Sequence, residues 1–158
     1  MRFLRSEIGE EPVIVEGVLR APVARVFRAW TDPEEIIKWF GLEAGAMRSA
    51  QIDLRVGGKW CFVIQEGEEG RQILQGEYIA IQPERHLEFS WRHLREHADG
   101  RREQTPDSKV TVTFRADGAS THLHLRHEGI LRQDGRLGVG RGWDATFEHL
   151  GDWLKQAA

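Results

Sequence analysis

The chain has 158 residues, a length that suits one compact domain. Hydrophobic residues make up 40% and charged residues 30%, so there is enough apolar surface for a core and the chain is not of the disordered class. Lys and Arg total 22 against 25 Asp and Glu; this net charge of −3 excludes the strong positive field that nucleic acid or anionic membranes attract. Six tryptophans accompany a single tyrosine. Because tryptophan is large, amphipathic and common in pocket walls, this excess indicates a concave apolar site.

The sequence carries no sign of export or membrane insertion. Its first residues contain no apolar run of signal-peptide length, and nowhere do apolar residues continue for the roughly 18 positions of a membrane span. We therefore expect a cytoplasmic protein that binds no membrane. Cys61 is the only cysteine, which excludes an internal disulfide and a cysteine metal cluster.

The first elements alternate between extended and helical patterns. Residues 13–20 are rich in β-branched side chains and predict the first strand. Apolar residues then recur at helical spacing over residues 22–30, which predicts a short helix that starts at a proline. A second short helix follows, with Thr31 or Asp32 as its N-cap and Gly41 as its C-cap.

The middle of the chain reads as strands joined by tight turns. The predicted strands are residues 51–55, 60–64, 72–81, 86–92, 110–115 and 122–126. The polar stretch 93–108 between two of them predicts a long exposed connection and a candidate mobile flap.

The C-terminal segment predicts a long helix. After residues 129–138, apolar and charged side chains lie on opposite sides of an amphipathic helix of about four or five turns. Strands joined by tight turns must pair antiparallel, so the element order predicts an α+β fold in which this helix covers one face of an antiparallel sheet. We expect a single domain over residues 1–158, with its core at about 13–154.

Five segments carry a resemblance to a known family. They are APVARVFRAWTDPEEIIKWF, DLRVGGKW, GEYIAIQPERHLEFSW, VTVTF and GWDATFEHLGDWL. In this order they resemble the SRPBCC superfamily, also called START or Bet v 1-like, in the branch of the activator-of-heat-shock-protein-ATPase homologues. The resemblance implies a helix-grip fold: a curved antiparallel sheet wraps around the C-terminal helix and leaves an internal apolar cavity.

The resemblance implies several functions. Members of the superfamily carry lipids, hormones and polyketides, some catalyse cyclisation, and others sequester small toxic metabolites. We expect non-catalytic binding of a small apolar or aromatic ligand by a monomer or homodimer, with no cofactor. The alternatives are a cyclase- or hydratase-like enzyme acting on a polyketide-like or aromatic metabolite, and a chaperone ATPase activator of the stress response. In the namesake co-chaperone a domain of this fold is joined to a separate N-terminal domain, for which we expect no room in this chain.

Rigid aromatic and apolar side chains are the candidates for the cavity wall, because such walls suit flat apolar ligands. The last helix and the facing strands supply Trp143, Phe147, Leu150, Trp60, Phe62, Phe89 and Trp91. If the resemblance holds, Trp39 and Phe40 lie at the cavity mouth. They can equally be a staple that holds the second short helix down.

Two polar residues are candidates inside the cavity. His127 shares strand parity with Leu123 and Leu125 and is predicted to face the cavity, as a hydrogen-bond donor or a proton acceptor with a pKa near neutrality. For Glu77 the facing is ambiguous, since both faces of its strand carry apolar residues. On the inner face, desolvation would raise its pKa and suit it to acid or base work; on the outer face it is a solvated strand residue.

The histidine pair His122 and His124 raises the question of a metal site. Residues two apart on a strand share one face, so both can reach one ion, but His127 has the opposite parity and the sequence supplies no third ligand. We therefore expect an exposed sheet face here and no metal.

Overall fold

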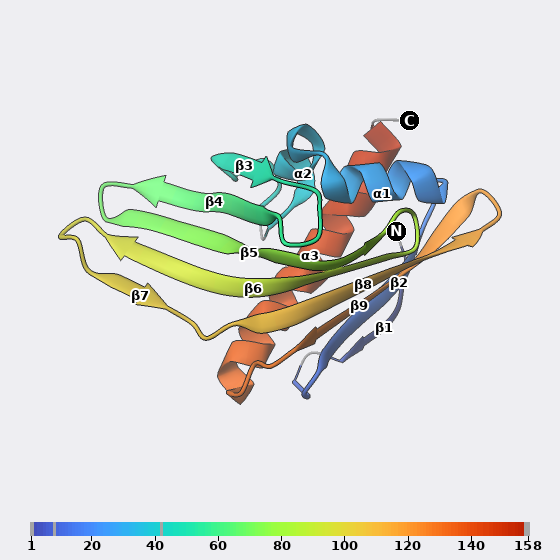
Figure 1. Cartoon of the computed structure of the whole chain (residues 1–158). Helices are drawn as coiled ribbons and strands as arrows, with labels where there is room; N and C mark the ends of the chain where they lie inside the picture. The colour runs from blue at the N-terminus through green and yellow to red at the C-terminus, as the bar shows by residue number, and fades with distance from the viewer. Residues whose placement is uncertain (1, 8, 42, 157–158) are drawn as a thin grey trace.

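The computed structural model describes residues 2–7, 9–41 and 43–156, which form one antiparallel sheet packed against a long helix (Figure 1). The elements in chain order are β1 (Arg2–Glu7), β2 (Val13–Leu19), α1 (Val23–Thr31), α2 (Pro33–Trp39), β3 (Ser49–Ile52), β4 (Lys59–Gly67), β5 (Gly70–Gln82), β6 (His86–His97), β7 (Arg102–Gln104), β8 (Ser108–Asp117), β9 (Ser120–Glu128) and α3 (Gln133–Gln156).

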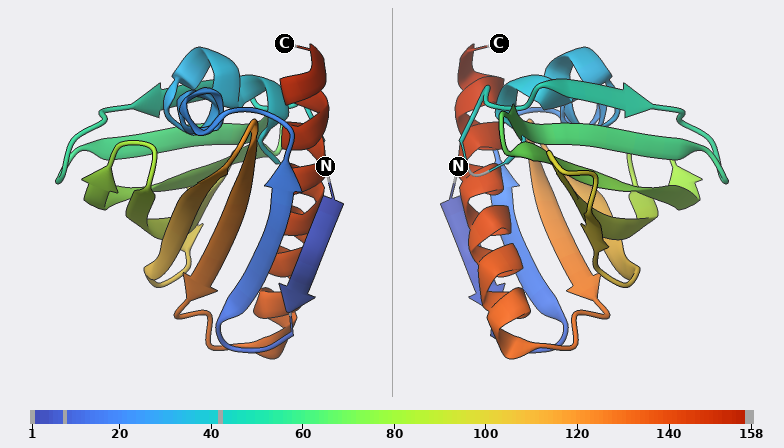
Figure 2. Two further views of the ribbon diagram at one scale, coloured as in Figure 1. Left: turned by 90° about the vertical axis from the view of Figure 1, so that its right-hand side faces the viewer. Right: turned by 90° about the vertical axis from the view of Figure 1, so that its left-hand side faces the viewer.

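Within the described residues the sheet has nine strands in the order β1-β2-β9-β8-β6-β5-β4-β3, with β7 beside β6. Every neighbouring pair is antiparallel. The side views in Figure 2 show the sheet curving around α3, while α1 and α2 lie across one end of it. The α+β, helix-grip architecture predicted from the sequence is therefore confirmed.

The core fills the space between α3 and the concave face of the sheet. Phe147 and Leu150 of α3 are fully buried, as are Leu123 and Leu125 of the facing strand β9. Burial alternates along β9, so one face of the strand packs on the core and the other faces outward. The predicted amphipathic pattern of the last helix thus matches its packing.

The break between the two short helices follows local chemistry. The side chain of Asp32 accepts a hydrogen bond of 2.9 Å from the backbone N–H of Glu34, and Pro33 takes the first helical position. At the other end of α2 the chain turns at Gly41, whose φ of 109° is in the region that glycine favours. The backbone of Gly41 is hydrogen-bonded to side chains of α3.

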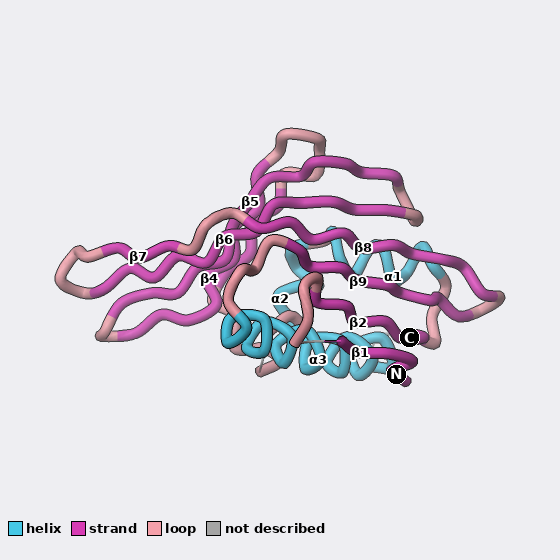
Figure 3. The backbone as a smooth tube through the Cα atoms, turned by 90° about the horizontal axis from the view of Figure 1, so that it is seen from below, coloured by secondary structure: helices cyan, strands magenta, loops and turns pink. Residues whose placement is uncertain are grey.

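Residues 93–108 are a correction to the sequence prediction of a long exposed connection. Strand β6 extends into this stretch as far as His97. Strand β7 then pairs antiparallel with β6, so that Leu94 lies opposite Gln104. Figure 3 shows this hairpin and the β4–β5 turn projecting at one end of the sheet. A ladder of backbone hydrogen bonds therefore orders a segment whose polar sequence resembles a loop.

The start of the last helix is a second correction. The helix begins at Gln133 rather than after residue 138, and it has 24 residues. Gly135 and Gly138 lie inside it, although glycine in a helix interior lowers the stability of the helix. Strand β1, which pairs with β2 at the sheet edge, was also not predicted.

Candidate functional site: a cavity between the last helix and the sheet

An open cavity of about 890 Å³ lies between α3 and strands β4, β5 and β6. The segment that follows α2 forms its third side. Its walls are Phe40, Gly41, Glu43, Ala46, Met47, Arg48, Ile64, Gln65, Glu66, Gln72, Leu74, Trp91, His93, Gly138, Val139, Gly142, Trp143 and Thr146. The volume is in the range of small-molecule sites.

Three aromatic rings from separate elements form the apolar floor of the cavity. The ring centroids of Trp91 and Trp143 lie 5.2 Å apart, and the ring of Phe40 lies 5.6 Å from Trp143 at an interplanar angle of 89°. The Phe40 and Trp91 centroids are 6.3 Å apart. These spacings are typical of favourable aromatic contacts, so this aromatic floor (Phe40, Trp91 and Trp143) is a rigid surface.

Two glycines one helical turn apart, Gly138 and Gly142, lie on the α3 side of the cavity. A Cβ atom added at Gly138 or Gly142 would have no heavy atom within 4 Å, apart from the helix backbone and chain neighbours. Each glycine in a helix interior costs about 0.5–1 kcal/mol relative to alanine. The sequence therefore keeps space open beside α3 at the expense of helix stability.

A polar relay crosses the three strands at the cavity wall. Gln72 Nε2 donates a hydrogen bond of 2.7 Å to Gln65 Oε1 on β4, and Gln72 Oε1 lies 3.1 Å from His93 Nε2 on β6. Burial, with a smaller contribution from the charge of Arg95, lowers the pKa of His93 below its ordinary value. The relay (Gln65, Gln72 and His93) thus presents a neutral imidazole at the cavity wall.

His127 lies behind the aromatic floor and not on the cavity wall. It faces the protein interior, as its strand parity predicts, but it is fully buried beneath Trp91 and Trp143. Trp143 Nε1 donates to His127 Nδ1 at 3.0 Å, and Ser108 Oγ lies 2.7 Å from Nε2. Burial lowers the pKa of His127 to about 3, so the expected pKa near neutrality is corrected.

Glu77 is not brought into the cavity either. Leu74 and Tyr78 are buried on the inner face of β5, whereas Glu77 is exposed. The sequence did not decide which face of this strand points inward, and the structure shows that the face with Leu74 does. The structure thus corrects the expectation that a carboxylate at this position acts inside the cavity.

The remaining candidates belong to the packed interior. Trp60, Phe62 and Phe89 line a void of about 20 Å³ beneath Phe40 and Trp91, which is about the size of one water molecule. Phe147 and Leu150 are fully buried in the core. Trp39 is also buried and donates from Nε1 to the carbonyl oxygen of Ala29 at 3.1 Å, which is the staple arrangement rather than a place at the mouth.

Sequence reasoning missed two features of the cavity. The Gly138 and Gly142 wall carries a signal, since the two glycines are four residues apart and so share one helix face. The polar relay was missed because His93 fell in the stretch interpreted as a loop. Gln72 lies on the strand whose inner face was ambiguous.

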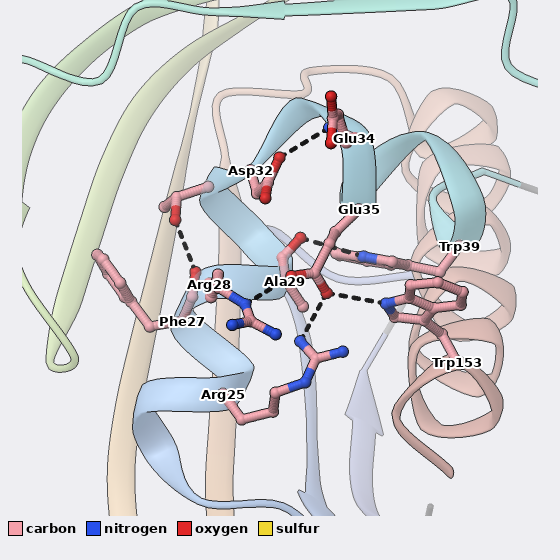
Figure 4. Close-up of polar contacts among 10 residues, drawn as sticks. Arg25, Phe27, Arg28, Ala29, Asp32, Glu34, Glu35, Trp39 and Trp153 are labelled. Carbon is pink, nitrogen blue, oxygen red and sulfur yellow. Dashed lines mark hydrogen bonds and ion pairs between the residues drawn. The ribbon is translucent and has the colours of Figure 1, made fainter. Parts of the chain in front are cut away.

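A buried carboxylate ties the three helices together (Figure 4). Glu35 of α2 accepts hydrogen bonds from Arg25 at 2.6 Å, Arg28 at 2.8 Å and Trp153 Nε1 at 3.0 Å. Burial alone would raise the pKa of Glu35, but these three donors outweigh it and the pKa is lowered. The cluster holds α2 against α3.

The segment after α2 is also tied to α3 directly. His149 Nδ1 donates to the carbonyl oxygen of Gly41 at 2.9 Å, and the backbone N–H of Gly41 donates to Thr146 Oγ1 at 3.3 Å. Two separate contacts thus fix the wall to which Phe40 belongs.

The outer-face histidines lie near a carboxylate. The Nε2 atoms of His122 and His124 are 3.7 and 4.0 Å from Glu16 Oε2. Among the residues that the structure describes, no group of three or more His, Cys, Asp and Glu could hold a metal ion. In the same residues no helix is long and apolar enough to cross a membrane.

A curved antiparallel sheet that closes on a C-terminal helix, with a cavity between them, defines the helix-grip class. A family model described as Activator of Hsp90 ATPase homolog 1-like protein matches residues 20–155, and the chain belongs to this family. The superfamily inferred from the sequence is thereby confirmed.

Solved structures show the same fold. Protein NE0264 from Nitrosomonas europaea is 22% identical, with a TM-score of 0.74 over 93% of this chain and 96% of that one. CalU16 from Micromonospora echinospora is 28% identical, with a TM-score of 0.66 over 95% and 81%. DynU16, described as a protein in the dynemicin biosynthetic locus, is 21% identical, with a TM-score of 0.72 over 94% and 48%. No curated protein matches the sequence.

Proposed function

We propose that the protein binds a flat apolar or aromatic small molecule in the cavity between α3 and strands β4 to β6, without catalysing a reaction. The observation that carries this proposal is the open space that Gly138 and Gly142 keep beside the aromatic floor. Rigid aromatic rings on one side and free volume on the other suit a planar ligand. That DynU16 is described as a product of a biosynthetic locus fits a role in handling small molecules.

The enzymatic alternative relied on His127 or Glu77. Since His127 is sealed behind two tryptophans and Glu77 is exposed on the outer face, neither can act on a molecule in the cavity. We therefore set aside the cyclase or hydratase mechanism that uses them. A chaperone-activating role, a cytoplasmic location and the monomeric or homodimeric state stay predictions from the sequence.

The proposal is tested by titration with 8-anilinonaphthalene-1-sulfonate, whose fluorescence rises in apolar sites. We expect saturable binding to the wild type. Gly142→Leu places a branched side chain in the cavity without a clash at Cβ and should weaken binding roughly 10-fold or more. Arg141→Leu adds an apolar side chain at an exposed position of the same helix and should leave cavity binding unchanged.

Three results would contradict the proposal: the dye does not bind, it binds equally to Gly142→Leu and the wild type, or Arg141→Leu weakens it as much as Gly142→Leu does. Far-ultraviolet circular dichroism of the variants checks that α3 is intact.

A further inference from the structure

The polar relay gives the cavity a defined hydrogen-bonding character. Gln65 and Gln72 are direct partners across β4 and β5, and Leu74, two residues along, is the direct partner of His93 on β6. The relay therefore crosses one face of the sheet, beside the aromatic floor. Its three side chains all line the cavity.

The direction of the hydrogen bonds fixes the tautomer of His93. Gln72 uses its amide nitrogen to donate to Gln65 Oε1, so its remaining amide atom, Oε1, accepts from His93 Nε2. The proton of the imidazole is therefore on Nε2. Nδ1 then carries a lone pair and is an acceptor, and burial, which lowers the pKa of His93, favours this neutral form.

His93 lies on the cavity wall beside the aromatic floor. His93 follows Trp91 by two residues on β6, so both project from the same face, and positions two apart on a strand are about 7 Å apart. A planar ligand that packs on Trp91 thus extends a substituent at its edge towards His93.

We propose that the cavity selects aromatic ligands that carry a hydroxyl group, such as phenols, with His93 Nδ1 as the acceptor of the hydroxyl hydrogen bond. This inference rests on the proposed binding function and specifies its ligand class. His93 is the specificity-determining residue, and Gln72 is a positioning residue that holds its tautomer. An aromatic ligand whose oxygen carries no hydrogen would leave the acceptor without a partner, which costs binding free energy.

The test compares 2-naphthol with 2-methoxynaphthalene, which has a similar ring and an oxygen that cannot donate. Equilibrium dialysis gives the dissociation constant of each. The methoxy compound is the more apolar, so hydrophobicity alone favours it. We expect the wild type to bind 2-naphthol about 5-fold tighter or more, which is the range of one hydrogen bond.

The variants locate the selecting residue. In His93→Phe the preference for 2-naphthol should disappear, while 2-methoxynaphthalene binds at least as well as to the wild type. The matched control is His86→Phe, on the same strand but outside the cavity, where His86 pairs with Glu88 at 2.9 Å. This control should keep the preference.

The outcomes separate the two proposals. If neither compound binds the wild type, the binding function and this inference both fail. If both bind without a preference for 2-naphthol, or if the preference survives in His93→Phe, the inference fails and the binding function stands. Imidazole ¹⁵N resonances of the wild type give a readout that needs no variant: 2-naphthol should shift His93 Nδ1, and an unchanged resonance in the bound state would overturn the inference.

Discussion

The indole Nε1 of Trp143 donates a hydrogen bond of 3.0 Å to Nδ1 of His127. Because Nδ1 accepts, the imidazole proton lies on Nε2, which donates to Ser108 Oγ at 2.7 Å. Ser108 in turn donates to the carbonyl oxygen of Trp91 at 3.3 Å. A buried neutral histidine therefore joins two members of the aromatic floor. Its role is to position the cavity wall.

We expect this histidine to make stability depend on pH. Burial lowers the pKa of His127 to about 3 from its ordinary 6.5, so below pH 6.5 the unfolded chain takes up a proton that the folded protein does not. The stabilisation that neutral His127 gives the folded protein is complete above pH 6.5, and it falls by about 1.4 kcal/mol per pH unit below that value. Between pH 7 and pH 5 the loss from this group is about 2 kcal/mol, measured by urea unfolding.

The variant His127→Gln isolates this contribution. Its free energy of unfolding should fall by about 2 kcal/mol less than that of the wild type between pH 7 and pH 5. An equal fall in both proteins would show that His127 does not carry the pH dependence.

We expect Trp143→Phe to destabilise the protein by about 1–3 kcal/mol. The phenyl ring fills part of the space, but His127 Nδ1 is left buried without its donor. A double-mutant cycle with His127→Phe measures the coupling, since removing both partners should cost less than the sum of the single changes. Additive effects in urea unfolding would contradict this coupling.

The Glu35 cluster predicts an order of effects on stability. Glu35→Gln removes the charge that Arg25 and Arg28 face and should cost about 2 kcal/mol at pH 7. Arg25→Ala should cost more than Arg28→Ala, because the two arginine side chains are 18% and 63% exposed. Thermal unfolding of the three variants checks the order, and a larger effect at Arg28 would refute it.

The Glu35 cluster also makes stability depend on pH: as for any carboxylate with a lowered pKa, the stabilisation is lost in acid. The pKa of Glu35 is lowered in the folded protein, so its stabilisation is present above the ordinary value of 4.5 and is lost as the pH falls through the folded value. The difference in stability between the wild type and Glu35→Gln should therefore shrink as the pH falls below 4.5. A difference that stays constant in urea unfolding down to acid pH would contradict this.

The glycines of α3 predict a gain in stability. Gly138→Ala and Gly142→Ala should each stabilise the protein by about 0.5–1 kcal/mol, because a helical position gains a side chain that meets open space. Gly135→Ala should gain less, since its Cβ would lie 3.2 Å from Ile130. Urea unfolding measures all three, and a loss at Gly142 would mean that the space beside it is filled.

The sequence predicted the fold where burial alternates clearly. The Asp32 cap and the alternating strand β9 both appear as expected, because each is set by local chemistry or by one buried face. The β6–β7 hairpin was missed since it projects beyond the helices and its charged side chains follow no burial pattern. The first turns of α3 were missed since they contain Gly135 and Gly138, and glycine is unfavourable inside a helix; of these two, Gly138 lines the cavity.

The site was predicted only in part. Phe40, Trp91 and Trp143 do line the cavity, because large aromatic residues mark concave surfaces in any fold of this kind. The alternation of apolar and polar residues could not show which face of β5 points towards the cavity. The register shifts between Tyr78 and Ala80, which leaves the apolar Ile79 exposed.

The central claim is that a planar aromatic molecule occupies the cavity against Trp91 and Trp143. The six tryptophans supply six indole N–H resonances in a ¹H–¹⁵N spectrum, and titration with 2-naphthol follows all of them at once. The account predicts saturable shifts of the Trp91 and Trp143 resonances. The Trp153 resonance should change little, because this indole is hydrogen-bonded to Glu35 and does not line the cavity. No shift at Trp91 and Trp143, or a shift at Trp153 alone, would contradict it.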